Sequence, residues 1–88
     1  MARAVPPKTT KPKIEHKKIG RHHAVGLAYK KENLIVIDER QKGKDYLDTA
    51  IHELLHIYLP NMLEAEVNQL ANNLTESLWD LKIRRVDE

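Results

Sequence analysis

Two long amphipathic patterns, separated by a proline, constrain what the C-terminal half of this chain can fold into. Over residues 45–59, apolar side chains recur at helical spacing, at Leu47, Ile51, Leu54, Leu55 and Tyr58. Over residues 63–83, a second apolar stripe runs through Val67, Leu70, Ala71, Leu74, Leu78 and Leu81. Pro60-Asn61 ends the first pattern. The sequence therefore predicts two antiparallel helices joined by a short turn.

The N-terminal half carries shorter, strand-like segments. Leu34–Asp38 begins with the apolar run LIVI, which is rich in β-branched residues, and a polar connection of four residues separates it from residues 24–29. This arrangement predicts a hairpin. Ile14 and Ile19 suggest a short first strand that ends near Gly20. The predicted fold class is α+β: a small antiparallel β-hairpin or three-stranded sheet followed by two antiparallel helices.

Length and composition narrow the classes of protein further. Eighty-eight residues make one small domain, which we place at residues 13–88. Residues 1–12 hold three of the four prolines and are predicted to be a flexible basic tail. The absence of cysteine excludes disulfides, cysteine-ligated zinc and iron–sulfur clusters. No apolar run approaches the roughly 20 residues of a membrane span, and the N-terminus lacks the apolar core of a secretory signal. We therefore expect a soluble cytoplasmic protein with no membrane partner.

The run His52-Glu53-Leu54-Leu55-His56 carries the chemistry of the chain. Residues at i and i+4 of a helix are neighbours on one face, so the two imidazoles can reach one metal ion. Glu53 then lies close enough to take a proton from water activated by that metal. The run lies within a strongly apolar helix, where unpaired imidazoles would be costly. These features predict a Zn²⁺ site of the H-E-x-x-H kind, with His52 and His56 as ligands and Glu53 as general base.

A catalytic zinc usually has a third protein ligand, and we expect it on the second helix. The acids Glu64 and Glu66 are the candidates. At about 100° per residue, Glu64 lies at the margin of the second apolar stripe and Glu66 further out. Glu64 is therefore the favoured ligand and Glu66 the alternative. His22 and His23 are more remote candidates from the strand side.

With these motifs in view, residues 26–81 resemble a zincin metallopeptidase. A strand such as Leu34–Asp38 ahead of a T-x-x-H-E-x-x-H helix, here Thr49 to His56, is similar to minimal SprT-like and ImmA/IrrE-like zincins. The chain looks closest to very small predicted metallopeptidases of bacteriophages. The resemblance implies zinc on His52 and His56, Glu53 as general base, peptide or protein substrates, and the host cytoplasm as location. The stretch from Glu66 to Ala71 is similar to the E-A-N-x-F-A run of ImmA/IrrE-like proteins, which would favour Glu66 as third ligand.

The sequence also offers candidates for substrate binding, for stabilising the substrate oxyanion and for orienting a histidine ligand. In larger zincins a strand edge binds the substrate, and Leu34–Asp38 could do so here if it is the exposed edge. Candidate donors for the substrate oxyanion are Tyr29, Tyr46, Tyr58 and His23. Asp48, four residues before His52, is either an acceptor that orients this histidine or a solvated acid of the first helical turn.

A different function is suggested by the uneven distribution of charge. Residues 1–23 contain seven Lys or Arg and one Glu, whereas residues 24–88 contain eight Lys or Arg and twelve acids. The basic segment could contact nucleic acid weakly, although few aromatic residues accompany the charges. The alternative function is therefore a non-catalytic, zinc-stabilised module that docks to nucleic acid or protein through this segment. Trp79 lies off the second apolar stripe, where a dimer contact is conceivable; the oligomeric state is open.

Overall fold

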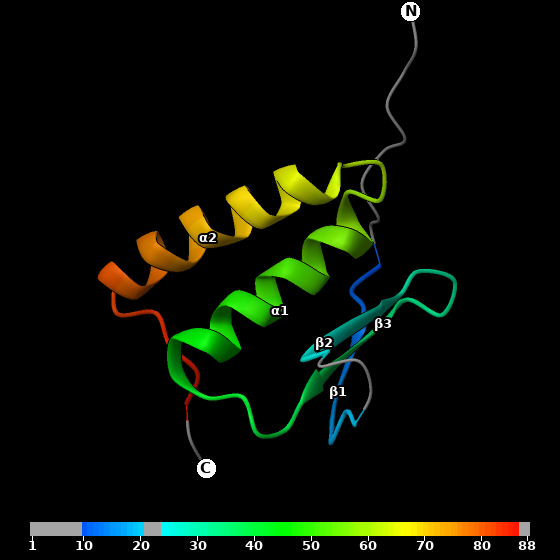
Figure 1. Ribbon diagram of the computed structural model, residues 1–88, viewed down its shortest axis with the longest axis horizontal. Helices are drawn as coiled ribbons and strands as arrows, with labels where there is room; N and C mark the ends of the chain where they lie inside the picture. The colour runs from blue at the N-terminus through cyan, green and yellow to red at the C-terminus, as the bar shows by residue number, and fades with distance from the viewer. Residues whose placement is uncertain (1–9, 21–23, 87–88) are drawn as a thin grey trace, which may run out of the picture.

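The computed structural model describes residues 10–20 and 24–86 and contains a three-stranded sheet followed by two helices (Figure 1). In chain order the elements are β1 (Lys13–Lys17), β2 (Gly26–Tyr29), β3 (Leu34–Asp38), α1 (Gly43–Tyr58) and α2 (Glu64–Asp80). The predicted α+β fold is confirmed. No helix in these residues is long and apolar enough to cross a membrane.

The sheet is mixed, with β3 in its centre and the strand order β1-β3-β2. β2 and β3 form the predicted antiparallel hairpin, whereas β1 pairs with β3 in parallel. Leu34–Asp38 is therefore not an exposed edge, and the condition for its role in substrate binding is not met. The physical reason lies in its side chains, because Ile35, Val36 and Ile37 are all at most 4% exposed. A continuous apolar run of this kind is typical of a strand that is buried on both faces, as an interior strand of a sheet is.

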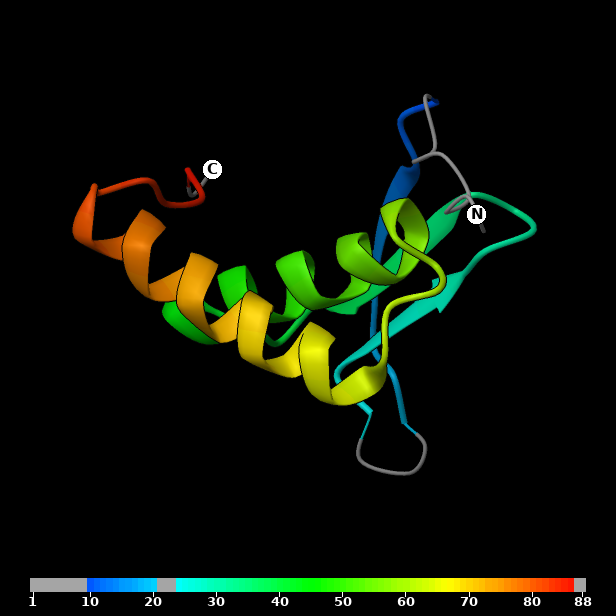
Figure 2. The same cartoon turned by 90° about the horizontal axis from the view of Figure 1, so that it is seen from above.

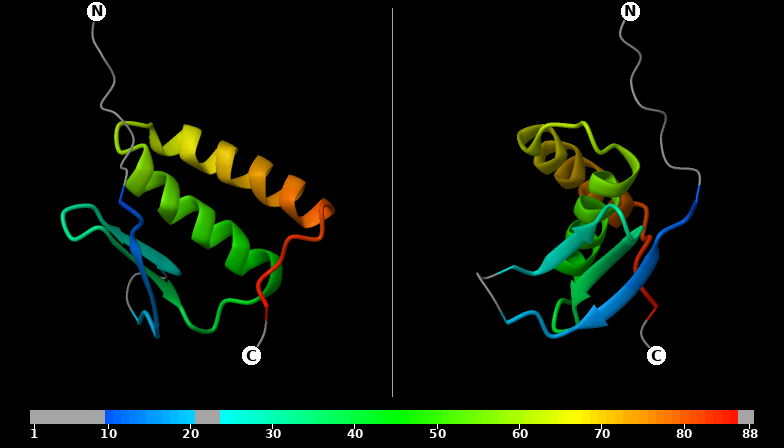
Figure 3. Two further views of the ribbon diagram at one scale, coloured as in Figure 1. Left: turned by 180° about the vertical axis from the view of Figure 1, so that it is seen from behind. Right: turned by 90° about the vertical axis from the view of Figure 1, so that its right-hand side faces the viewer.

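The three layers stack in the order sheet, α1, α2. Helix α1 packs against β2 and β3 on one side and against α2 on the other, and α2 packs on α1 but not on the sheet (Figures 2 and 3). The core lies between β3 and α1, where Ile35, Ile37 and Ile57 are at most 1% exposed. Helix α1 is thus the central element of the fold, and its side chains face protein on two sides.

The most deeply buried line on each helix includes polar residues. On α1 this line is Thr49, Glu53 and Ile57, and on α2 it is Val67, Ala71 and Thr75. The apolar residues predicted to face inward mostly flank these lines and are half-buried. The predicted inner stripe of α2 is shifted, because Leu74 is 38% exposed and Leu81 lies beyond the end of the helix.

The turn between β2 and β3 holds the segment that leads into β1. Asn33 adopts a left-handed conformation with φ 53°, and its Nδ2 atom donates to the carbonyls of Thr10 and Lys11 at 3.2 and 3.3 Å. Pro12 is buried beside them. Residues 10–12 of the predicted tail therefore lie against the domain, and residues 1–9 lie outside the described part of the chain.

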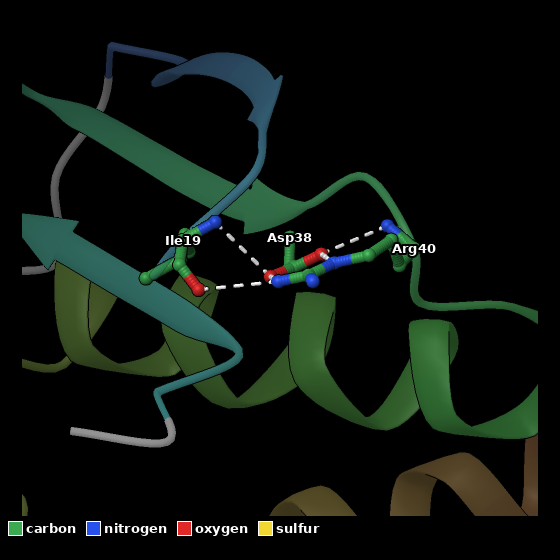
Figure 4. Close-up of polar contacts among 3 residues, drawn as sticks. All are labelled: Ile19, Asp38 and Arg40. Carbon is green, nitrogen blue, oxygen red and sulfur yellow. Dashed lines mark hydrogen bonds and ion pairs between the residues drawn. The ribbon is translucent and has the colours of Figure 1, made fainter. Parts of the chain in front are cut away.

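An ion pair between the buried Asp38 and the exposed Arg40 fixes the other end of the sheet (Figure 4). The Asp38 carboxylate, in a residue only 3% exposed, accepts hydrogen bonds from Nε and Nη2 of Arg40 and from the backbone N–H groups of Arg40 and Ile19. The Arg40 guanidinium also donates to the Ile19 carbonyl at 3.3 Å. These contacts join the segment after β1 to the end of β3. They also hold the pKa of Asp38 well below its usual range, because Arg40 stabilises the charged form.

Candidate metal centre

His52 and His56 lie one turn apart near the C-terminal end of α1. Their Nε2 atoms are 3.2 Å apart, and their side chains are 22% and 21% exposed. The two rings meet edge to face, with centroids 4.8 Å apart. The helical spacing predicted from the sequence thus directs both ring nitrogens to the same point.

Glu64 reaches this point from the second helix. The chain reverses after Leu59, whose carbonyl accepts a hydrogen bond from the Met62 N–H at 3.1 Å, so that α2 begins directly at Glu64. The Glu64 carboxylate places Oε2 at 3.2 Å from Nε2 of His52 and Oε1 at 3.0 Å from Nε2 of His56. Among the described residues, these three side chains form the one group that could hold a metal ion.

The donor set and its spacing fit zinc. Tetrahedral zinc with bonds of about 2.0–2.1 Å has neighbouring ligand atoms about 3.3 Å apart. The Nε2 atoms of His52 and His56 are 3.2 Å apart, and each lies 3.2 or 3.0 Å from a different oxygen of the Glu64 carboxylate. With one ligand atom taken from each residue, the three atoms lie within 4.8 Å of one another. Two imidazoles and one carboxylate also match the ligands of a catalytic zinc site that keeps an open position.

Glu66 has a different role. Its Oε1 atom accepts a hydrogen bond from the Leu63 backbone N–H at 3.1 Å, so this side chain caps the start of α2. It is not part of the group formed by His52, His56 and Glu64. The structure therefore separates the two acids that the sequence left as alternatives, with Glu64 at the histidine pair and Glu66 at the helix start. His22 and His23 lie outside the described residues.

Glu53 is a buried carboxylate next to the histidine pair. The residue is 9% exposed, and burial raises the pKa of its carboxyl group, opposed by His52 and reinforced by Glu64. No described residue donates a hydrogen bond to its carboxylate. A carboxylate in this setting is available to exchange a proton with a molecule bound at the site.

The environment of His56 favours the form that binds metals. Burial lowers the pKa of its imidazole, opposed by the charge of Glu64 and supported by His52 and Lys30. A metal ion binds only the neutral ring, so this shift favours coordination. Lys30 was not singled out from the sequence; its Nζ atom donates to the Pro60 carbonyl at 3.5 Å, beside the turn between the helices. The sequence feature that could have indicated Lys30 is its position in the polar run directly after β2.

The candidate oxyanion donors are scattered through the fold. Tyr46 lies ten residues before His56, about 15 Å along the helix, and its hydroxyl contacts His16 Nε2 at 2.7 Å. Tyr29, 42% exposed, ends β2, and Tyr58 is half-buried at the end of α1. His23 lies outside the described residues. No donor for an oxyanion is therefore assigned.

Two further residues have structural partners. Asp48 is half-buried and accepts a hydrogen bond from the Thr75 hydroxyl at 3.3 Å, so it joins α1 to α2, and no hydrogen bond links it to His52. Neither of the two roles suggested for Asp48, orienting His52 or lying in solvent, describes its contact with Thr75.

Trp79 is half-buried, and the Arg84 guanidinium lies 3.8 Å from its ring centroid.

No protein-family model, curated protein or solved structure matches the chain. What the site can do therefore has to be inferred from the arrangement of its own residues.

Proposed function

We propose that this protein is a zinc-dependent peptidase. The observation that carries the proposal is the convergence of His52, His56 and Glu64 within 4.8 Å of one another, with the buried Glu53 between the two histidines in sequence. A purely structural zinc site is normally closed by four protein ligands. Three ligands with a neighbouring carboxylate that accepts no hydrogen bond from the described part of the chain are typical of a site that activates water.

Zinc held by the three ligands would supply a Lewis acid that polarises the scissile carbonyl and acidifies water. Glu53 accepts the proton from the attacking water and passes it to the leaving amine. Its burial supports this role, because a raised pKa brings a carboxyl group closer to the pH at which it can both accept and return a proton. Glu64 would bind the zinc from α2 and the two histidines from α1, so the metal would join the two helices.

The substrate would bind along β2. In the described sheet β2 pairs only with β3, so its other edge is free, and it packs against the helix that carries Glu53. An extended peptide can add to such an edge through backbone hydrogen bonds. Because β3 is the central strand, β2 replaces it as the strand edge proposed to bind the substrate.

The test is the substitution Glu53→Gln, compared with Glu76→Gln as a matched control. Glu76 is an exposed acid on α2 whose partner is Lys44, at 2.9 Å. With zinc loaded and an unfolded protein such as casein as substrate, we expect Glu53→Gln to lower turnover about 10²- to 10⁴-fold. Zinc content, measured by elemental analysis, should equal that of the wild type.

A zinc-loaded wild type without turnover on a broad peptide library would contradict the peptidase proposal. The alternative, a zinc-stabilised binding module, predicts instead that the cellular effect of the protein survives Glu53→Gln. Its nucleic-acid form also predicts a salt-sensitive shift of DNA that is lost when residues 1–12 are removed.

A further inference from the structure

Gly26, the first residue of β2, lies directly against the buried polar line of α1. A Cβ atom added at this position would lie 2.7 Å from Cγ2 of Thr49, 2.9 Å from Cγ of Glu53 and 3.0 Å from Oε2 of Glu53. These distances are shorter than van der Waals contact. Any side chain at this position would therefore have to displace the helix, the strand or the Glu53 side chain.

The need for glycine here is a need for space and not for an unusual backbone. Gly43 and Asn33 have positive φ angles, but Gly26 does not. Ala28, two residues along the same strand and on the same face, carries a Cβ and packs against the core. Within β2, the residue without a Cβ, Gly26, is therefore the one against which the Glu53 side chain lies.

We propose that Gly26 is a positioning residue for Glu53: the absence of a side chain at this strand position lets the Glu53 carboxylate lie against β2, beside the histidine pair. The inference rests on the proposed peptidase function for its catalytic consequence. Its structural part concerns only Gly26, Thr49 and Glu53.

The energetics of the two close contacts differ. Thr49 is β-branched and held in a helix, so its methyl group has little freedom to move. The Glu53 side chain has more rotatable bonds, and rotation would carry its carboxylate away from β2 towards solvent. Adding a methyl group at residue 26 therefore displaces Glu53 once the contact with Thr49 is removed. Thr49→Ser removes that contact and keeps the hydroxyl that donates to Gln41 at 2.6 Å.

The experiment is a double-mutant cycle in the Thr49→Ser background. It compares this variant alone with the same variant carrying Gly26→Ala, Glu53→Ala or both, by thermal unfolding with saturating zinc. Overpacking by Gly26→Ala should lower the melting temperature by about 5–15 °C when Glu53 is present. At least half of this loss should disappear with Glu53→Ala, because the side chain that is overpacked is gone. Gly20→Ala is the control, since no atom lies within 4 Å of a Cβ added there.

Turnover is measured in parallel on the variants that retain Glu53. Gly26→Ala should lower kcat about 100-fold, as a misplacement of about 1 Å can do. Zinc affinity should stay within about threefold, because the three atoms nearest to a Cβ added at residue 26 belong to Thr49 and Glu53 and not to a proposed ligand. A purely structural role for Gly26 would lower the melting temperature without reducing kcat of the folded enzyme.

The outcomes separate this inference from the peptidase proposal. Additive melting-temperature changes in the cycle, or an unchanged kcat in Gly26→Ala, would overturn it. Failure of Gly26→Ala to fold in the Thr49→Ser background would also overturn it if Glu53→Ala does not restore folding, because Gly26 would then serve only the packing of β2 on α1. If the wild type shows no turnover, the peptidase proposal fails, and the cycle still decides whether Gly26 positions Glu53.

Discussion

The proposed role of Glu64 as third zinc ligand yields the sharpest quantitative prediction. One carboxylate oxygen of Glu64 faces each histidine, at 3.2 and 3.0 Å, whereas Glu66 accepts a hydrogen bond from the Leu63 N–H. Glu64→Gln should therefore weaken zinc binding strongly, and Glu66→Gln should leave it nearly unchanged. Both substitutions remove one negative charge from the first turn of the same helix, so the pair is matched.

The size of the effect follows from linkage. At a free zinc concentration 100 times the wild-type Kd, zinc stabilises the fold by about 2.7 kcal/mol. For a domain of this size that raises the melting temperature by about 10–20 °C. Residues that only support a ligand cost about 10- to 100-fold in affinity when removed, so loss of Glu64 should cost at least about 100-fold. At the same zinc concentration the remaining stabilisation is then about 0.4 kcal/mol, or about 2–3 °C.

The assay measures the melting temperature of the three proteins with and without zinc, near neutral pH, alongside a zinc titration by calorimetry. Without zinc, Glu64→Gln should melt close to the wild type, because the Glu64 side chain is 63% exposed and exposed ion pairs contribute little. A zinc-induced shift that survives Glu64→Gln and is lost in Glu66→Gln would refute the assignment. A wild type whose melting temperature does not respond to zinc would refute the metal centre itself.

Two further predictions concern the fold alone and are made without zinc. Ile37 is fully buried in the core between the sheet and α1, so Ile37→Val should lower the free energy of unfolding in urea by about 0.5–1.5 kcal/mol. Ile14 is 46% exposed, so Ile14→Val should change this free energy by no more than about 0.5 kcal/mol. Equal changes in the two variants would contradict the location of the core. Asp38 is held in its charged form by Arg40, and its folded-state pKa lies below the unfolded value of about 3.9. Its stabilising contribution is therefore present above about pH 4 and is lost as the pH falls through the folded-state pKa, so the stability gap between wild type and Asp38→Asn should narrow below about pH 4. A gap that stays constant into the acid range would show that the ion pair does not stabilise the fold.

The order of the elements could be predicted from local patterns. The two amphipathic stretches, the proline between them and the β-branched run of β3 are each consistent with only a few local structures, and the described residues form them. The pairing of β1 with β3 in parallel could not be predicted in this way. It depends on contacts between segments about 20 residues apart, and neither strand carries a local signal for its partner.

Predictions of which helix face is innermost were less accurate, because they counted only apolar residues. On α2 the buried line is Val67, Ala71 and Thr75, which spans from 0° to about 80° when Val67 is set to zero. Thr75 is 4% exposed and donates to Asp48, so a small polar residue belongs to the interface. Leaving it out moved the estimated centre of the face away from Glu64.

The same correction explains why Glu64 and not Glu66 meets the histidines. With the buried line centred near 40°, Glu64 at about 60° lies within the face that α2 turns towards α1, while Glu66 at about −100° lies well outside it. The positions of Glu64 and Glu66 around the helix, and not a chemical difference between their carboxylates, therefore determine which of them faces the histidines. A helix that packs on α1 through Val67, Ala71 and Thr75 brings its first residue, Glu64, to the histidine pair, so the proposed metal centre is a consequence of helix packing. Zinc binding should accordingly be sensitive to overpacking at Ala71, which is 1% exposed and lies two turns from Glu64.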